Sequence, residues 1–331
     1  MSWKVVLLVL GSFALVVLAL ISAGFLPAET ASELIRGSLG SKRAISGTLK
    51  EMTPLLIAGV GVYLALRAGL FNIGIEGQFL LGAITATVVG LHVPGALGVV
   101  LSLLAAMTVG AVWAWPAGWI KAYRGGHEVI TTIMLNNVAL FLTAGLVAGP
   151  LKDPASPSPT TETLSAATRI PALINAPPLQ INLALILGGA LLVVLALWLK
   201  RTVSGYELSA VGANSTAASV AGIDVRKTLV RAMTVSGAIG GFAGACQVLA
   251  FEGRFYNGFS PGYGFDALGV ALLAGSSPWA MLGSAFLFGA LAKGTTVVQL
   301  MGVPKGISGI LLGLLIICFA AVRYRRTGNS V

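Results

Sequence analysis

The chain has 331 residues, of which 56% are hydrophobic and only 10% charged, and its mean hydropathy is +0.91. A soluble domain carries roughly 25% charged residues to cover its surface, so this composition excludes an ordinary soluble fold. The net charge of +10 does not indicate nucleic-acid binding, because the basic residues lie at the ends of apolar runs, where they set membrane orientation. The 43 glycines favour close packing of membrane-spanning helices.

The apolar runs predict an all-α bundle of about ten membrane-spanning helices, forming a single domain over residues 1–331. The first run is about as long as a bilayer is thick and longer than a signal-peptide core. We interpret it as a retained span, with cleavage as the alternative. In chain order the predicted spans are 5–25, 53–66, 79–93, 95–120, 130–149, 181–199, 232–251, 265–276, 279–298 and 307–322. The run 265–276 is short and is compatible with a half-helix inside the bundle.

Ten crossings with a cytoplasmic amino terminus place both termini in the cytoplasm. Residues 150–180, rich in Pro, Ser and Thr, are predicted to form an external loop, and residues 202–228 a cytoplasmic segment. One group of basic residues fits this orientation poorly, because it lies on the external side of the membrane: Arg36, Lys42, Arg43 and Lys50. Acidic residues accompany this group, so we interpret residues 27–51 as a surface helix.

The sequence lacks the motifs that several kinds of chemistry require. No GxxxxGK[ST] string is present, so this chain has no phosphate-binding loop of its own. His92 and His127 stand alone, without a GxSxG elbow or an HExxH pair, and Cys246 and Cys318 lie in apolar segments. We predict no catalytic residues, no metal site and no cofactor on this chain.

Two strings carry polar side chains among apolar ones. The first, residues 66–78, contains Asn72, Glu76 and Gln78 together with helix-weakening glycines, and the second, residues 125–137, carries Asn136 and Asn137 into a predicted span. Polar groups at membrane depth are costly and tend to line pathways. We therefore predict that these five side chains line a substrate pathway. The alternatives are an ordinary cytoplasmic turn for the first string and hydrogen bonds to neighbouring helices for the second.

A third string lies in the predicted cytoplasmic segment. Residues 215–221 are small and predict a short helix that Asn214 caps and Gly222 ends. A short helix that exposes small side chains suits docking into a groove of another protein, and an ordinary loop is the alternative.

Together these strings resemble the permease family of ABC importers for branched-chain amino acids, ribose-type sugars and nucleosides, nearest to the nucleoside and simple-sugar permeases. The resemblance covers residues 52–325 and rests on the following strings: Gly69-Leu70-Phe71-Asn72-Ile73-Gly74-Ile75-Glu76-Gly77-Gln78, Glu128-Val129-Ile130-Thr131-Thr132-Ile133-Met134-Leu135-Asn136, Val211-Gly212-Ala213-Asn214, Ala217-Ala218, Ala221-Gly222-Ile223, Ser236-Gly237-Ala238 and Gly264-Phe265-Asp266-Ala267. Asn137 departs from the family pattern, in which an aromatic residue is common.

The resemblance implies a multi-pass protein of the bacterial cytoplasmic (inner) membrane. Its expected partners are a cytoplasmic ATPase that binds ATP, a sister permease, an external substrate-binding protein or lipoprotein, and the lipid bilayer. Gln78 is the form expected of one member of a heterodimeric pore. Residues 202–228 would be the coupling segment seated on the ATPase, with the residues Glu207, Gly212, Asn214, Ala217, Ala218, Gly222 and Asp224.

The rival function is an ion-gradient-driven secondary transporter, in which Glu76 and Lys293 would be the ionisable groups. It would need no ATPase. In the importer, by contrast, a binding protein would deliver the solute, with a nucleoside as the first expectation and a simple sugar as the second.

Overall fold

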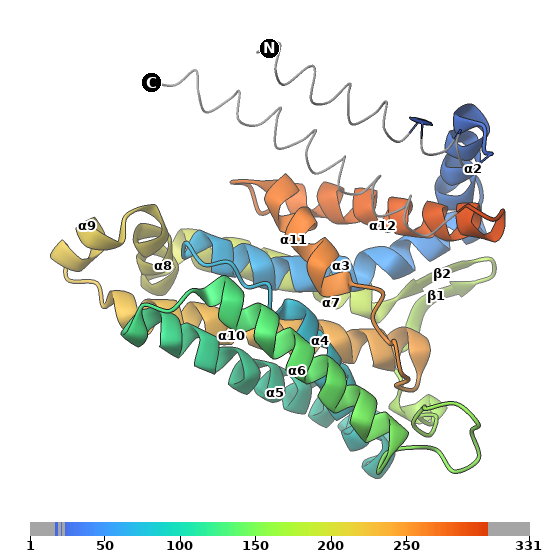
Figure 1. Ribbon diagram of the computed structural model, residues 1–331, viewed down its shortest axis with the longest axis horizontal. Helices are drawn as coiled ribbons and strands as arrows, with labels where there is room; N and C mark the ends of the chain where they lie inside the picture. The colour runs from blue at the N-terminus through green and yellow to red at the C-terminus, as the bar shows by residue number, and fades with distance from the viewer. Residues whose placement is uncertain (1–16, 19–20, 22–23, 304–331) are drawn as a thin grey trace.

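The computed structural model describes residues 17, 18, 21 and 24–303, and the predicted spans 5–25 and 307–322 lie largely or wholly outside them. Helices dominate the described part (Figure 1). In chain order its elements are α2 (Pro27–Leu39), α3 (Lys42–Arg67), α4 (Ile75–His92), α5 (Gly95–Arg124), α6 (Glu128–Ala148), the 3-10 turn η1 (Ala166–Thr168), β1 (Ala172–Ala176), β2 (Leu179–Asn182), α7 (Leu183–Arg201), α8 (Val203–Ala213), α9 (Ser215–Val220), α10 (Val225–Gln247), the π-helical turn η2 (Val248–Glu252), α11 (Tyr263–Ala274) and α12 (Ala280–Leu300).

Seven of the described helices are long and apolar enough to cross a membrane, namely α3, α4, α5, α6, α7, α10 and α12. Every predicted run between residues 53 and 298 contains a helix, which confirms the predicted helical bundle. The short run 265–276 is α11, only 12 residues long. At 1.5 Å per residue α11 measures roughly 18 Å, too short for a bilayer core of roughly 30 Å.

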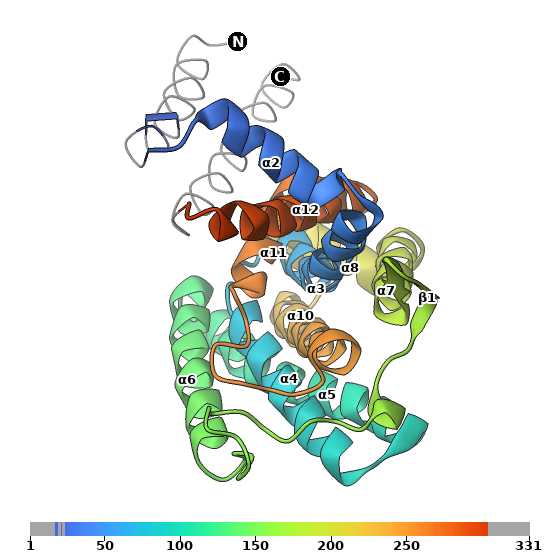
Figure 2. The same cartoon turned by 90° about the vertical axis from the view of Figure 1, so that its right-hand side faces the viewer.

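The spanning helices form an inner and an outer set. In α3 and α4 the most apolar stretch is 78% and 72% buried, whereas in α5 and α6 it is only 22% buried. Seen from the end of the bundle, α10 lies near the centre, between α3, α4 and α5 (Figure 2). The outer helices present long apolar side chains outward, as a protein surrounded by lipid requires.

Glycines allow the inner helices to pack backbone against backbone. A Cβ atom on Gly241 of α10 would collide with the carbonyl oxygen of Ala106 on α5, and one on Gly82 of α4 would collide with the carbonyl oxygen of Gly241. Small residues bring membrane helices into van der Waals contact where no hydrophobic force draws them together. The high glycine content therefore has the packing role that the composition predicts.

The predicted surface helix over residues 27–51 is wrong. The structure has two helices there, α2 and the first turns of α3, which begins at Lys42 and continues without a break into the span. Ser41 caps α3 by accepting a hydrogen bond from the Ala44 amide at 3.0 Å. Lys50 forms an ion pair, because its ammonium lies 3.0 Å from the Glu252 carboxylate.

The loop of residues 150–180 is ordered against the end of the bundle. The amides of Thr161 and Leu164 donate to the carbonyl oxygens of Phe255 and Gly253, both at 2.8 Å. The loop continues into the antiparallel hairpin of β1 and β2, which the sequence did not predict because the apolar run appeared to begin at residue 181. We call this end of the bundle the hairpin end and the opposite end, which carries α8 and α9, the α9 end (Figure 1).

Candidate functional site

The polar string between α3 and α4 turns back into the bundle. Asn72 is fully buried, and its side-chain amide donates to the Ser236 hydroxyl at 2.8 Å, while that hydroxyl donates to the Gly61 carbonyl at 2.7 Å. Gly61 lies six residues before the end of α3 at Arg67, or roughly 9 Å along the helix axis. The segment 68–74 is therefore re-entrant, not a turn at the membrane surface, and α4 begins inside the bundle.

Asn72 and Gln78 form a reciprocal pair of side-chain amides. The Asn72 nitrogen donates to the Gln78 oxygen at 3.0 Å, and the Gln78 nitrogen donates back to the Asn72 oxygen at 3.2 Å. Both residues are buried, so this pairing satisfies polar atoms that would otherwise lie unpaired at membrane depth. The pair fixes the path of the re-entrant segment against the start of α4.

Asn136 on α6 completes this arrangement. Its side-chain oxygen accepts from the Gly77 amide at 2.9 Å, and its nitrogen donates to the Ile73 carbonyl at 2.8 Å. Asn136 thus caps the amino end of α4, where backbone amides have no partner within the helix. We call Asn72, Gln78, Asn136 and Ser236 the interior polar cluster.

Asn137 lies apart from the interior polar cluster although it is next in sequence. Its side chain is exposed on the outer face of α6, and its nitrogen donates to the Ile133 carbonyl of its own helix at 3.0 Å. The neighbouring exposed side chains on that face are apolar, among them Met134 and Phe141. An amide on such a face near the middle of a span has only one hydrogen bond within the described chain.

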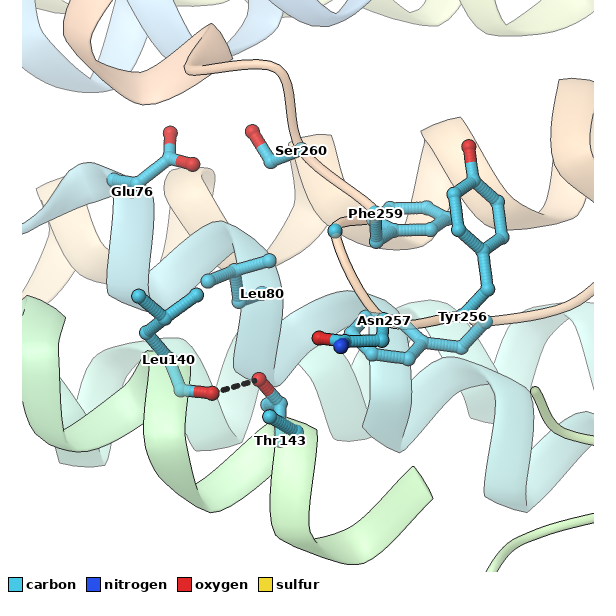
Figure 3. Close-up of a pocket in the computed structure, with 11 residues that line it drawn as sticks. Glu76, Leu80, Leu140, Thr143, Tyr256, Asn257, Phe259 and Ser260 are labelled. Carbon is cyan, nitrogen blue, oxygen red and sulfur yellow. Dashed lines mark hydrogen bonds between the residues drawn. The ribbon is translucent and has the colours of Figure 1, made fainter. Parts of the chain in front are cut away.

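Glu76 joins α4 to the half-helix α11. Its carboxylate accepts from the Gly264 amide at 2.6 Å, in the first turn of α11, and a Cβ on Gly264 would collide with the Glu76 backbone. A carboxylate at a helix amino terminus interacts favourably with the helix dipole. In Figure 3 the side chains of Glu76 and Ser260 point toward each other across the start of α11.

Glu76 also lines a pocket between α4, α6 and the loop that precedes α11 (Figure 3). The pocket is small, with a cavity volume of about 30 Å³, far below a usual ligand site of 300–1,000 Å³. The residues that line it are Glu76, Leu80, Leu140, Thr143, Ala144, Phe255, Tyr256, Asn257, Gly258, Phe259 and Ser260. Glu76 is the one member of the five predicted pathway residues found in this lining.

Aromatic rings form one wall of the pocket. Phe255 and Phe259 stack with ring centroids 4.7 Å apart, and Tyr256 meets Phe259 edge-on at 5.5 Å. Burial, with the nearby Glu252 carboxylate, raises the pKa of Tyr256, so its phenol stays neutral and can donate a hydrogen bond. The Asn257 amide side chain makes no hydrogen bond to the described residues, so it is available to a ligand.

This loop was not predicted as a site from the sequence. The string Phe255-Tyr256-Asn257-Gly258-Phe259-Ser260 lies between two predicted spans and matches none of the motifs considered above. Its density of aromatic residues is the signal that could have revealed it, because aromatic side chains with a few polar groups are typical of ligand pockets.

Glu76 and Lys293, the two ionisable groups of the rival transporter, are not brought together. Lys293 on α12 packs its side chain over Gly47 near the start of α3, where a Cβ would lie 2.6 Å from its Cε atom. Glu76 instead bonds to α11 in the interior.

The predicted coupling segment contains a short helix where the sequence placed one. Asn214 caps α9 by accepting from the Ala217 amide at 3.0 Å, and the chain turns at Gly222 with a φ of 86°. Asp224 then caps α10, accepting from the Lys227 amide at 3.0 Å, and this bond lowers the pKa of Asp224. Both caps satisfy amides that the helices leave unpaired.

The outer surface of α8 and α9 is free of contacts with the described bundle. Val203, Tyr206 and Val220 are exposed, and Val220 reaches 87%. Ala217 is exposed as well, whereas Ala218 faces inward and Glu207 is half-buried. Figure 1 shows that α9 projects beyond the ends of the spanning helices.

Gly212 has a different position from the rest of the coupling segment. A Cβ on Gly212 would collide with the Arg67 carbonyl oxygen at the end of α3. Gly69, with a φ of 76°, packs against Gly212 at the same place. Gly212 therefore fixes α8 to α3 rather than offering a surface to another protein.

A scan against protein families matches residues 44–320 to the permease component of branched-chain amino acid transport systems. The chain is 34% identical to the guanosine ABC transporter permease protein NupP of Bacillus subtilis, over 95% of this chain and 91% of NupP. It is 32% identical to the glucose ABC transporter permease protein TsgB13 of Haloferax volcanii, over 94% of this chain and 85% of TsgB13. A second guanosine ABC transporter permease protein of Bacillus subtilis, NupQ, is 27% identical over 81% of this chain and 86% of NupQ. No solved structure matches the chain.

The chain therefore belongs to this family of ABC transporter permeases. It is a membrane-embedded permease subunit of an ABC importer, as the sequence strings predicted, and the comparisons give no support to the secondary transporter.

Proposed function

We propose that this chain forms one half of the pathway of an importer that carries a nucleoside into the cytoplasm. The observation that carries this proposal is the composition of the pocket beside Glu76. A carboxylate, the Asn257 side-chain amide, which no described residue bonds, and the rings of Tyr256 and Phe259 suit a solute with hydroxyl groups and a flat ring.

A simple sugar is the second candidate, because aromatic rings and carboxylates also suit hydroxyl-rich rings, and because the relative TsgB13 is named for glucose. The name of NupP favours the nucleoside.

The pathway needs a second subunit. The pocket beside Glu76 is smaller than a usual ligand site, and Asn137 exposes an amide near the middle of a span. Polar groups at that depth face a bundle interior or a water-filled cavity, not lipid. A sister permease against the α6 face would complete the pocket and give Asn137 a polar environment. The Gln78 form of the first motif and the similarity of this chain to both NupP and NupQ support a heterodimer.

The energy source would be ATP bound by a separate cytoplasmic ATPase. The exposed surface of α9, with Ala217 and Val220, would seat on that ATPase, and this chain would carry no cofactor. The orientation follows from Lys121, Arg124, Lys200 and Arg201, which end α5 and α7 at the α9 end and favour the cytoplasmic side of a bacterial cell membrane.

At the hairpin end the importer would receive solute from an external binding protein.

The test of the proposed function is to purify the tagged chain in a mild detergent, identify the proteins that accompany it, and reconstitute the complex in proteoliposomes. We expect ATP-dependent uptake of labelled guanosine that exceeds uptake of labelled glucose and persists with an uncoupler. Uptake that needs an ion gradient and no ATP would contradict the importer. Preferential glucose uptake would replace the nucleoside by the sugar.

The substitution Glu76→Gln tests the role of the pocket in the same proteoliposome uptake assay. We expect lower uptake with unchanged recovery of the ATPase, because the substitution removes a charge from the pocket and leaves α9 untouched. Leu97→Gln, an exposed substitution near the start of α5, is the control.

A further inference from the structure

A second and larger cavity lies at the hairpin end, outside the proposed pathway. It lies between α3, α7, the hairpin and η2 and has a volume of about 230 Å³. The residues that line it are Ser46, Gly47, Leu49, Lys50, Thr53, Arg169, Ile170, Ala172, Gln180, Asn182, Leu185, Ala250 and Phe251. The importer mechanism assigns no task to this cavity.

Arg169 is the group that needs an explanation. Its side chain is only half-exposed, its Nε atom is buried without a hydrogen-bond partner, and no carboxylate among the described residues pairs with it. A guanidinium has five N–H donors and no acceptor, and it cannot lose its charge. Buried donors are nearly always satisfied in folded proteins. The charged guanidinium therefore has no acidic partner among the described residues, and an anion in the cavity would supply one.

The backbone beside Arg169 is shaped around its side chain. The guanidinium occupies the space beside Gly253 so closely that a Cβ on Gly253 would collide with the Arg169 nitrogen atoms. Gly253 has a φ of 69°, which favours glycine. This contact holds Arg169 at the wall of the cavity.

The charges around the cavity leave a net positive value. Lys50 is paired with Glu252 at 3.0 Å and lies 5.7 Å from the centre of the Phe251 ring. The charges of Lys50 and Glu252 balance, so among the side chains that line the cavity Arg169 contributes the remaining positive charge. Lys50 has three N–H donors, of which Glu252 takes one. A ligand with a single negative charge fits this balance.

The rest of the lining is mixed, with the polar side chains of Ser46, Thr53, Gln180 and Asn182 beside apolar ones, and part of it belongs to the spanning helices α3 and α7. The cavity extends along α3 from Ser46 to Thr53, or roughly 10 Å of helix. Leu49, Ile170, Leu185 and Phe251 form its apolar walls. Leu185 belongs to the first turn of α7, which is a spanning helix.

We propose that this cavity binds one phospholipid with an anionic headgroup from the leaflet at the hairpin end, with Arg169 contacting the phosphate. The apolar walls of Leu49 and Leu185 then contact the first part of an acyl chain. The terminal nitrogens of the guanidinium would donate to the phosphate oxygens, and planar guanidinium groups bind phosphate in two parallel hydrogen bonds.

The apolar wall favours a lipid over an acidic side chain of the external binding protein. A protein side chain would use the guanidinium but would leave the space beside Leu49 and Leu185 unfilled. A lipid would contact both the guanidinium and these apolar side chains, because its phosphate is joined to hydrocarbon. Free phosphate shares only the headgroup chemistry.

The test compares Arg169→Gln with Arg254→Gln, a substitution of an exposed arginine in the same region that does not line the cavity. The full-length chain, in the complex with which it co-purifies, is depleted of lipid by detergent exchange. Phosphatidylglycerol, phosphatidylcholine or inorganic phosphate is then added, and thermal unfolding and the phospholipid retained in native mass spectra are measured.

We expect phosphatidylglycerol to raise the unfolding temperature of the wild type and of Arg254→Gln more than phosphatidylcholine does. Arg169→Gln should retain phosphatidylglycerol roughly fivefold less well, the effect of one basic group near an anionic lipid. Leu185→Trp, which fills the space beside Leu49 and leaves Arg169 in place, should also lose the lipid, and it tests the proposal separately if Arg169→Gln folds poorly.

Three results would overturn the proposal. Equal lipid retention by Arg169→Gln and Arg254→Gln would show that Arg169 does not bind the headgroup. Equal stabilisation by inorganic phosphate would replace the lipid with a free anion. Unchanged lipid retention with lost binding of the external protein would assign Arg169 to that protein contact.

Discussion

The interior polar cluster and the coupling segment are both rich in small and polar residues, yet their side chains have opposite surroundings. In the interior polar cluster every side-chain amide is directed at another group of the same chain, and three separate helices contribute. In α9 the side chains of Ala217 and Val220 are directed away from the bundle. Segments rich in small and polar residues therefore do not all have the same role in a membrane protein. Some close the fold, and others leave a surface for a partner.

The comparison also separates neighbours in sequence. Asn136 and Asn137 are identical side chains, but one bonds two backbone groups of another segment and the other bonds only its own helix. Within the coupling segment, Gly212 belongs to the packed interior, whereas Val220 belongs to the free surface. Substitutions at these positions test whether the distinction has the expected energetic consequence.

The largest effect is expected for Asn136→Leu. The substitution leaves the Gly77 amide and the Ile73 carbonyl without partners, at about 1–3 kcal/mol for each buried group. Asn137→Leu, on the exposed face, should change stability by no more than about 0.5 kcal/mol. Thermal unfolding in detergent measures both, and equal losses would show that Asn136 is not the cap of α4.

Gly212→Ala should have the next largest effect. Its added methyl group meets the Arg67 carbonyl oxygen and forces α8 away from α3, and overpacking of this kind costs about 1–3 kcal/mol. Ala213→Ser, on the exposed neighbour, is the matched control and should leave the unfolding temperature unchanged. Because Gly212 is a packing residue, a loss of transport on substituting it would not by itself identify an ATPase contact.

Val220→Asp examines the free surface directly. We expect normal thermal stability, because Val220 is 87% exposed, and about tenfold weaker recovery of the ATPase in a pull-down. Leu173→Asp, on an exposed strand residue at the hairpin end, should recover the ATPase normally. Normal recovery with Val220→Asp would remove α9 from the proposed docking surface.

The smallest effect concerns the caps of α9 and α10 and depends on pH. The Lys227 amide lowers the pKa of Asp224, so the folded state binds this proton less readily than the unfolded state. The bond is present above the ordinary carboxyl value and is lost as pH falls through the lowered value, below about 4. We expect hydrogen exchange of the Lys227 amide to lose protection in acid. The Ala217 amide, capped by the non-titrating Asn214, should keep its protection.

Particular residues show how far the sequence could be read. The apolar runs and the small-residue string at 215–221 predicted the spanning helices and α9, because length, hydropathy and capping residues are local properties. The surface helix over residues 27–51 was wrong. The charge of Lys50 is compensated by Glu252, about two hundred positions away, and no local pattern records that contact. The pathway role of Asn72, Glu76, Gln78, Asn136 and Asn137 stays a prediction.

The sequence by itself determined that this protein is a helical membrane permease of the ABC family and where its polar strings lie, because membrane spans and family motifs are written in contiguous residues. Only the tertiary structure decided which of those polar groups close on one another. It also placed the aromatic loop beside Glu76, and at a separate cavity it left Arg169 without a carboxylate partner among the described residues. These groupings join residues from separate helices, and burial and partnership depend on which helices pack together rather than on spacing along the chain.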